Sequence, residues 1–259
     1  MRAVALGVDV GSTTCKAVAL DAAGRTVLER LEPADPRVEP QVERMLEELR
    51  AVAEPGAPVG ATGYGRKRVR SSRVLTEITC HARGAFAHAG RPGLLVDMGG
   101  QDTKVIRIGV HGEVLDFAMN DKCAAGTGRF LEVILGRLRV PLAEVAGFAR
   151  AADRKVAVSS TCTVFAESEV ISLVAAGEPL SGIVRGLHQA LAARVAALLR
   201  ASADAAGEIE IWMSGGVAQN AAMVAALEEA LGRAVAVLPR PQLVGAIGAA
   251  LAVLPGGHP

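Results

Sequence analysis

Two cysteines occupy positions where a thiol could do chemistry. Cys123 precedes a short run of small residues, 124–128, and an apolar helical pattern follows it. Cys162 stands among hydroxyl residues and leads into a second apolar stretch, 164–173. The free N–H groups and positive dipole end of a helix favour a thiolate, or an anion bound by one, at such a place. Two such cysteines provide half of the four thiolates that an iron–sulfur cluster normally needs.

The remaining cysteines and the histidines give weaker signals. Cys15 falls inside an expected hairpin and Cys80 inside an expected helix, where a small buried side chain is the default expectation. The chain has no C-x-x-C pair, which excludes a zinc ribbon or a thioredoxin-type motif. The histidines show no spacing typical of metal ligands. Cys123 and Cys162 therefore remain as the candidate metal ligands.

A second kind of chemistry is indicated by a motif that occurs twice. The motif is Asp-x-Gly with a lysine seven positions after the aspartate, and its copies are Asp9-Gly11-Lys16 and Asp97-Gly99-Lys104. Backbone N–H groups at such glycines can cradle phosphate oxygens. Asp9 and Asp97 could approach a hydrated Mg²⁺, which keeps several of its waters in proteins. We therefore expect the two motifs to hold the phosphates of a nucleoside triphosphate with its Mg²⁺.

Further polar groups are expected around this nucleotide. Hydroxyl donors, extra glycines and a terminal amide surround the motifs: Ser12, Thr13, Thr14, Gly100, Gly215, Gly216 and Gln219. Gln101 and Asp102 could orient the attacking water, as a glutamine does in other NTPases. The alternative for this pair is a purely structural role in the turn. No G-x-x-x-x-G-K-[ST] sequence occurs, which excludes a P-loop NTPase.

Composition excludes several other functions. The 259 residues include 28 basic and 27 acidic side chains, so there is no electrostatic argument for nucleic acid or an anionic membrane. Aromatic residues make up 3%, too few for platforms on which bases stack. The apolar segment 243–254 is shorter than a membrane span, and no secretory signal is visible. We expect a cytoplasmic protein that binds neither nucleic acid nor membrane.

Strands and helices that could position these groups are visible as hydrophobic patterns. Strands are expected at 4–10, 15–20, 26–31, from 94, at 105–108, 114–117, 209–213 and 235–238. Helices are expected at 38–53, 75–89, 130–138, 164–173, 180–199, 220–231 and 243–255. Hairpins followed by helices indicate an α/β chain with mixed sheets. A strand–turn–strand unit that recurs after 88 residues suggests two halves of similar architecture.

The motifs resemble those of a known superfamily. Asp9 to Thr13 resembles the first phosphate loop of the actin, sugar-kinase and heat-shock-70 superfamily, Asp97 to Asp102 its second, and Met213 to Asn220 its adenosine segment. Four stretches are similar to one branch, the ATP-dependent activators of 2-hydroxyacyl-CoA dehydratases and the ATPase subunits of benzoyl-CoA reductase: 62–66, 99–104, 120–128 and 162–169. The match runs from Gly7 to the terminal helix.

This resemblance implies a fold and a mechanism. The fold would be two duplicated actin-like (ribonuclease H-like) halves around an ATP cleft, 1–92 and 93–259, with the helix at about 243–255 packing back on the first half. Cys123 and Cys162 of two copies would bind one [4Fe-4S] cluster on the two-fold axis of a homodimer. ATP hydrolysis would change the angle between the helices that flank the cluster. A low-potential electron, received from a ferredoxin or flavodoxin, would then pass to the dehydratase.

Three alternatives remain open from the sequence. The partner could be another reductase, of the benzoyl-CoA or double-cubane type. The chain could be a small-molecule kinase of the same superfamily, although this gives no reason for two cysteines at helix starts. It could also be a nucleotide-binding partner protein without catalytic activity. The sequence does not name the acyl-CoA substrate, because the partner enzyme would bind it.

Overall fold

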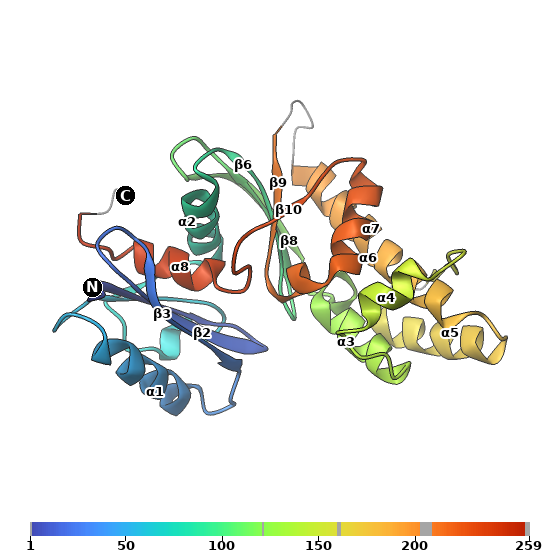
Figure 1. Ribbon diagram of the computed structural model, residues 1–259, viewed down its shortest axis with the longest axis horizontal. Helices are drawn as coiled ribbons and strands as arrows, with labels where there is room; N and C mark the ends of the chain where they lie inside the picture. Colours follow the sequence, from blue (N-terminus) through green and yellow to red (C-terminus); the bar gives the residue numbers. More distant parts are fainter. Residues whose placement is uncertain (1, 121, 160–161, 203–208, 257–259) are drawn as a thin grey trace. The chain divides into compact units, whose positions relative to one another are not determined.

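The computed structural model describes residues 2–120, 122–159, 162–202 and 209–256. These residues form two five-stranded mixed sheets with helices packed on them (Figure 1). The α/β fold class expected from the sequence is confirmed, with two sheets consistent with duplicated actin-like halves. No helix in the described ranges has the length and apolar character needed to cross a membrane.

The first sheet has the strand order β3-β2-β1-β4-β5. Its strands are β1 (Ala5–Val10), β2 (Thr14–Leu20), β3 (Thr26–Pro33), β4 (Val59–Thr62) and β5 (Arg73–Val74). β1 and β2 form an antiparallel hairpin, and β1 pairs with β4 in parallel. Helix α1 (Val38–Ala51) and helix α8 (Val244–Leu251) cover opposite faces of this sheet (Figure 1). Alternate residues of β2 accordingly pack on the two helices, Ala17 toward α1 and Val18 toward α8.

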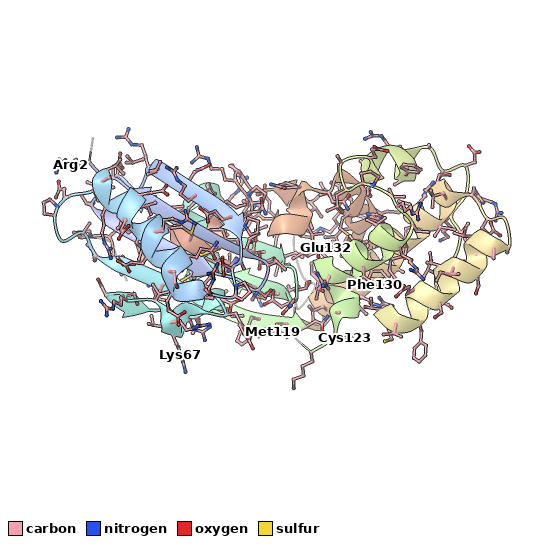
Figure 2. The ribbon with its side chains drawn as sticks, turned by 90° about the horizontal axis from the view of Figure 1, so that it is seen from below. Arg2, Lys67, Met119, Cys123, Phe130 and Glu132 are labelled. Atoms are coloured by element: carbon pink, nitrogen blue, oxygen red, sulfur yellow. The ribbon has the colours of Figure 1, made fainter. Side chains whose placement is uncertain are left out.

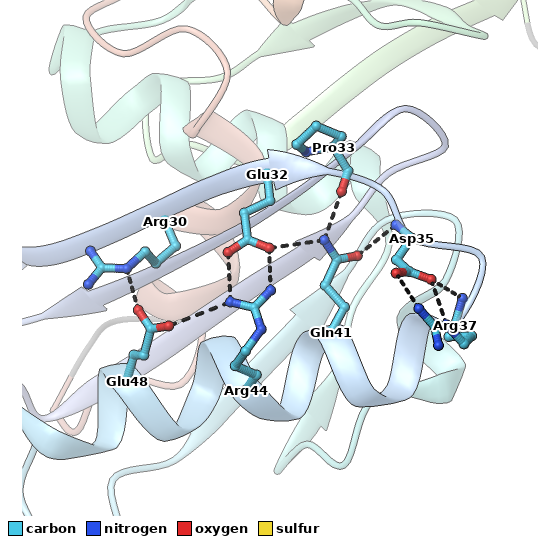
Figure 3. A network of polar contacts seen from close by, with 8 residues as sticks. All are labelled: Arg30, Glu32, Pro33, Asp35, Arg37, Gln41, Arg44 and Glu48. Atoms are coloured by element: carbon cyan, nitrogen blue, oxygen red, sulfur yellow. Dashed lines mark hydrogen bonds and ion pairs between the residues drawn. The ribbon is translucent and has the colours of Figure 1, made fainter.

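Polar side chains hold α1 against the edge strand β3 (Figure 3). Arg44 forms two hydrogen bonds to the carboxylate of Glu32, 2.9 and 2.5 Å long. Arg30 reaches Glu48 on the helix at 2.5 Å. The Gln41 side-chain amide donates to the Pro33 carbonyl at 2.7 Å, and its oxygen accepts from the backbone N–H of Asp35. Paired charges and a buried amide thus fix the helix where the sheet edge is polar.

Helix α8 approaches its neighbours through glycines. A Cβ atom at Gly7 of β1 would lie 2.1 Å from the Ala246 carbonyl oxygen, and one at Gly60 of β4 would lie 2.0 Å from that of Ala249. Helix α2 (Glu77–Ala89) makes the same kind of contact, because a Cβ at Gly84 would lie 2.1 Å from the Val244 oxygen. These backbones are too close for any side chain. Glycine is therefore required at the contacts.

The second sheet has the strand order β10-β9-β6-β7-β8. Its strands are β6 (Gly93–Met98), β7 (Thr103–Ile108), β8 (Val114–Asn120), β9 (Ile211–Ser214) and β10 (Ala236–Val237). The associated helices are α3 (Gly128–Arg137), α4 (Val145–Arg150), α5 (Thr163–Ala175), α6 (Leu180–Ser202) and α7 (Ala221–Leu231). Residues of all five helices share one core with Val96 and Met98 of β6.

The chain divides into two compact units. Unit 1 comprises residues 1–93, 106–116 and 238–259, and unit 2 comprises 94–105 and 117–237. Helix α8, near the end of the chain, therefore belongs with the first sheet and with α2. Unit 2 contains the second copy of the Asp-x-Gly motif and both candidate metal ligands. The sequence predicts halves at 1–92 and 93–259, with the helix at about 243–255 packing back on the first half, and this division stays a prediction.

Candidate functional site

The first Asp-x-Gly motif forms the turn between β1 and β2. Asp9 and Lys16 are register partners on the two strands, and the Lys16 Nζ lies 3.4 Å from the Asp9 carboxylate. The Gly11 N–H closes the turn by donating to the Thr14 carbonyl at 3.1 Å. Asp9 is 5% exposed. A buried carboxylate needs such a partner to remain charged.

The second motif repeats this geometry between β6 and β7. The Gly99 N–H donates to the Asp102 carbonyl, three residues on, at 2.9 Å. The Lys104 Nζ lies 3.6 Å from the Asp97 carboxylate and 2.7 Å from that of Asp102. Both hairpins thus place a glycine N–H bond in the turn and an aspartate beside a lysine. The Asp-x-Gly motif that repeats in the sequence therefore also repeats its geometry in the structure.

The predicted adenosine segment lies beside this second turn. Ser214, the last residue of β9, donates its hydroxyl to Asp97 Oδ1 at 2.8 Å. Gly215 has φ +88°, and a Cβ there would lie 2.2 Å from the Met98 carbonyl oxygen. The short helix η3 (Gly216–Gln219) then leads to α7. Two segments more than a hundred residues apart in sequence therefore meet at the end of β6.

The other predicted nucleotide residues lie in or next to the same turns. Ser12 is exposed, whereas Thr13 and Thr14 are half-buried. Gly100 is half-buried, and Gly216 and Gln219 are exposed. Both hairpins leave polar groups accessible for phosphate oxygens.

Gln101 and Asp102 differ in the contacts that their side chains make. Gln101 is exposed at the tip of the second turn. Asp102 accepts a hydrogen bond from Lys104 at 2.7 Å, and its Oδ1 lies where a side chain at position 99 would be. This pairing favours a turn-forming role for Asp102 over a role in orienting water. Of the two side chains, that of Gln101 is the freer.

Carboxylates of both hairpins fit Mg²⁺ best through water. Asp97 is 3% exposed, with Ser214 on one oxygen and Lys104 near the other. Asp9 has its Oδ2 beside Lys16. Because the lysines already neutralise these oxygens, direct coordination would require the ion pairs to break. Coordination through water keeps them intact.

Cys123 and Cys162 both stand immediately before helices in unit 2. Cys123 precedes the short helix η2 (Ala124–Gly126), after which α3 begins, and Figure 2 shows it on the outside of the ribbon ahead of Phe130 and Glu132. Cys162 is the residue before α5. Both residues have extended backbone angles, and neither side chain caps its helix. Cys123 is exposed and Cys162 half-buried.

Cys15 and Cys80 have the opposite environment. Both are completely buried. Burial raises the pKa of each thiol from 9.0 to about 12, and the charge of Asp9 adds to the effect at both. A thiol of this kind is a poor metal ligand because the ligand form is the thiolate. The donor set on this chain that fits an iron–sulfur cluster is therefore the pair Cys123 and Cys162.

The described part of the chain contains no group of three or more His, Cys, Asp or Glu side chains arranged to hold a metal ion. Two thiolates complete a four-thiolate set when a second copy supplies the other two.

Helix α5 is joined to its surroundings by two glutamates near Cys162. Glu167 forms an ion pair with Arg137 of α3, with 3.2 Å between N and O. Glu169 accepts hydrogen bonds from the backbone N–H and hydroxyl of Ser159, both 2.8 Å long. Hydroxyl residues often cap helix starts, which makes Thr163 and Ser160 candidate caps in the sequence. Thr163 does not cap α5, because Cys162 is the cap residue and the Thr163 hydroxyl is buried without a partner. Ser160, the other suggested cap, lies outside the described residues.

Several polar residues around the site were not predicted from the sequence. His188 of α6 is 1% exposed; its Nδ1 donates to the Val184 carbonyl at 2.7 Å, and its Nε2 accepts from the Asn220 amide at 2.9 Å. Asn220 in turn caps α7, with its oxygen accepting from two backbone N–H groups. In unit 1, His81 and Asp9 both border Gly245. An asparagine before an alanine-rich run is a readable cap signal, whereas a lone histidine within a helix is not.

Two sheets with the same Asp–Gly–Lys hairpin, and a glycine turn after β9, define an actin-like ATPase. The sequence pattern of the BadF/BadG/BcrA/BcrD ATPase family matches residues 6–253. The chain is 40% identical over 257 residues to the (R)-2-hydroxyglutaryl-CoA dehydratase activating ATPase of Acidaminococcus fermentans, with 97% of each chain covered. It is 41% identical over 250 residues to the activator of lactoyl-CoA dehydratase of Anaerotignum propionicum, with 95% of each covered.

A solved structure shows the same similarity. The activator of the 2-hydroxyisocaproyl-CoA dehydratase from Clostridium difficile, with bound ADPNP, superimposes with a TM-score of 0.88 at 35% identity. The match covers 98% of this chain and 95% of that one. This chain belongs to the BadF/BadG/BcrA/BcrD ATPase family.

Proposed function

We propose that this protein is an ATP-hydrolysing activator that delivers a low-potential electron to a 2-hydroxyacyl-CoA dehydratase. The observation that carries the proposal is the pair of accessible thiols, Cys123 and Cys162, placed before two helices of an ATPase unit. An ATPase that only transferred phosphate would have no use for them. The named relatives, which activate dehydratases of this substrate class, support the same conclusion.

The nucleotide is ATP with Mg²⁺. In this proposal the turns that follow Asp9 and Asp97 bind its phosphates through backbone N–H groups, and the segment from Gly215 to Gln219 contacts its adenosine. The aspartates hold the waters of Mg²⁺, and Gln101 orients the water that attacks the terminal phosphate. The ADPNP bound to the Clostridium difficile activator supports a nucleotide in this fold.

The cluster ligands are completed by a second copy of the chain, so the active species is a homodimer. Helix α5 has an apolar exposed face next to Cys162, formed by Val164, Phe165, Ile171 and Val174. An exposed apolar patch of this kind is typical of a surface that another chain covers. A symmetric pair places each thiol next to its own equivalent.

A bound [4Fe-4S] cluster would supply one-electron chemistry at low potential. The chain's own contribution is to hold the two thiols immediately before η2 and α5, Cys123 exposed and Cys162 half-buried. A ferredoxin or flavodoxin would provide the electron, and the dehydratase would receive it. Coupling to ATP requires the nucleotide to bind two conformations of the chain with different affinity.

The direct test is anaerobic purification followed by iron analysis and EPR spectroscopy of the dithionite-reduced protein. We expect about four irons per two chains, a sedimentation mass of two chains, and ATP-dependent activation of a dehydratase. Cys123→Ser and Cys162→Ser should each remove the iron and the EPR signal. Cys80→Ala is the matched control, because its thiol is buried, and it should retain both.

Three outcomes would contradict the proposal. If wild-type protein and the Cys123→Ser variant were equally free of iron, the electron-transfer function would fail. Phosphate transfer to an acid or sugar, by a protein without iron, would instead assign the chain to the kinases of the superfamily. Activity that persisted unchanged in air would also count against a solvent-near cluster.

A further inference from the structure

The first turn of α3 is capped by the second Asp-x-Gly hairpin. The N–H groups of Gly128 and Arg129 donate to the carbonyls of Gly99 and Gly100, each at 2.9 Å. The first N–H groups of a helix have no partner within the helix and need one from outside. Here the partners are the two backbone carbonyls at the turn that would hold the phosphates.

The side chain of the residue before α3 does not share this capping task. Thr127 precedes α3, but its hydroxyl donates backward to the Ala124 carbonyl at 2.8 Å and makes no cap bond. A serine, threonine, asparagine or aspartate at this place would ordinarily accept from the free N–H groups. Because Thr127 does not, the start of α3 depends on where Gly99 and Gly100 lie.

Gly128 permits this contact because it lacks a side chain. A Cβ at position 128 would lie 2.9 Å from the Gly99 carbonyl oxygen and 2.9 Å from Val217 Cγ2. Val217 belongs to η3, in the predicted adenosine segment. Gly128 therefore touches both nucleotide-binding segments of unit 2, and any larger residue would separate them from α3.

Two side chains hold the residues between Cys123 and α3 to the same framework. The Thr103 hydroxyl, at the start of β7, donates to the Gly126 carbonyl at 2.7 Å and is buried. Arg194 of α6 donates to the Ala125 carbonyl at 2.7 Å, and its guanidinium lies 5.5 Å from the centre of the Phe130 ring. The turn that carries Cys123 is thus bonded to β7 and α6 as well as to the hairpin.

We propose that Gly128 and Thr103 are positioning residues through which the nucleotide state of the Gly99–Gly100 turn sets the position of Cys123. A nucleotide that orders these two residues also fixes the carbonyls that cap α3. The Cys123 turn, joined to the same residues by Thr103, is fixed with them. The inference rests on the proposed function only in taking this turn as a phosphate site.

Hydrogen exchange of the backbone amides measures this connection without requiring a cluster. The full chain, purified anaerobically, is compared with and without ADPNP and Mg²⁺, and exchange is followed by mass spectrometry in residues 124–129. We expect ADPNP to slow exchange at Gly128 and Arg129 about tenfold, with a smaller slowing at Gly126 and Thr127. ADPNP affinity is measured separately by calorimetry, and iron content on the same sample.

Gly128→Ala should abolish the slowing, because the added Cβ displaces α3 from the Gly99 carbonyl. The control is Gly136→Ala in the same helix, where a Cβ would meet no atom within 4 Å; its response should equal that of wild type. If Gly128→Ala fails to fold or to bind ADPNP, Thr103→Val decides, since it leaves the Gly99–Gly100 turn intact. Thr103→Val should lose the response at Gly126 and Thr127, and Thr103→Ser should restore it.

The proposal is overturned if ADPNP binds wild-type protein without changing exchange in 124–129. It is equally overturned if both Gly128→Ala and Thr103→Val bind ADPNP and respond as wild type does. A chain that shows the full exchange response but holds no iron would refute the electron-transfer function and leave the connection standing. The two proposals are therefore tested independently.

Discussion

At the scale of single residues, the chain's four cysteines fall into two groups according to their surroundings. Cys15 and Cys80 are buried among apolar neighbours, whereas Cys123 is exposed and Cys162 half-buried. Desolvation disfavours a thiolate and therefore raises the thiol pKa. The same residue type thus serves as a packing group at two positions and as a candidate ligand at two others.

The buried thiols predict a loss of stability at alkaline pH. Their pKa is about 12 in the folded chain and 9.0 when unfolded, so the unfolded chain loses protons first as the pH rises above 9. At pH 10 each thiol should therefore lower the free energy of unfolding by about 1.4 kcal/mol. Urea unfolding at pH 8 and pH 10 measures this, and Cys80→Ala should reduce the loss by that amount. Equal losses in variant and wild type would refute the assignment.

His188 predicts the opposite pH dependence, on the acid side. Burial lowers its pKa below 6.5, and a proton on Nε2 would face the donating amide of Asn220. The unfolded chain then binds the proton more readily, so stability is present above pH 6.5 and is lost as the pH falls below it, by up to about 1.4 kcal/mol per pH unit. Unfolding at pH 7 and pH 5 should show this loss.

Two variants locate that acid sensitivity. His188→Gln should reduce the loss between pH 7 and pH 5, whereas His111→Gln, at an exposed position, should retain it in full. Arg185 and Glu229 lie nearby as an ion pair with 4.0 Å between N and O, and Gln189 also contacts Glu229. If His188→Gln kept the wild-type slope, the assignment of the loss to His188 would be refuted.

The sequence was sufficient to propose residues whose types could carry the chemistry. Asp9, Asp97 and the cysteines were recognisable because their spacing to glycines and helix patterns repeats. Arg194 and Thr103 were not, because their partners are backbone carbonyls, which carry no sequence signal. Carbonyl acceptors are available at almost every residue, so only the fold reveals which one a side chain meets.

At the scale of elements, the contacts of α8 are made by backbone against backbone. Gly84 of α2 and Gly248 of α8 each face a carbonyl oxygen of the other helix, with 2.1 and 1.8 Å left for a Cβ. Helices that meet through small residues bring their backbones unusually close. Such a contact tolerates no added volume, because the backbone cannot turn aside as a side chain can.

Gly84→Ala should therefore destabilise the protein although alanine favours helices. Overpacking of a close contact costs about 1–3 kcal/mol, against a gain of about 1 kcal/mol from replacing helical glycine. Gly136→Ala, in a helix with open space at that position, should be neutral or stabilising by up to about 1 kcal/mol. Urea midpoints of the two variants give the comparison. A stabilised Gly84→Ala protein would show that α8 can move away from α2.

Most elements were predictable because their hydrophobic periodicity is strong. The hairpins, α1, α2, α6 and α7 lie close to their expected positions. Helix α4 was not predicted, because six residues are too few to display a helical period. The expected strand 235–238 is limited to Ala236–Val237, since only two residues pair with β9. Pairing of this kind depends on a distant strand and is invisible in a local pattern.

At the scale of the whole molecule, unit 1 is built from three separate stretches of chain. Residues 238–259 complete it, and they include α8, which packs on β1, β4 and α2. Val18 and Leu20 of β2 form an apolar cluster with Leu243, Ala246, Ile247 and Ala250. Without α8 this face of the first sheet would be open to water.

Removal of residues 238–259 should therefore open unit 1 selectively. We expect limited proteolysis of the shortened chain to cleave within 1–93, while peptides from 117–237 remain protected. The core of unit 2 contains no residue beyond Val235, which is why it should survive. The full-length chain under the same conditions is the control. Equal protection of residues 1–93 in both proteins would show that α8 is dispensable.

The placement of α8 also orders events during synthesis. A ribosome produces β2 of the first sheet early, but the helix that covers one face of this strand begins more than two hundred residues after Leu20. Unit 2, made almost entirely of one continuous stretch, is complete before that helix emerges. The early strands therefore keep one apolar face exposed until α8 has been made. Such a face promotes chaperone binding or aggregation. Helix α8, which is made after all of these strands, ends this exposure.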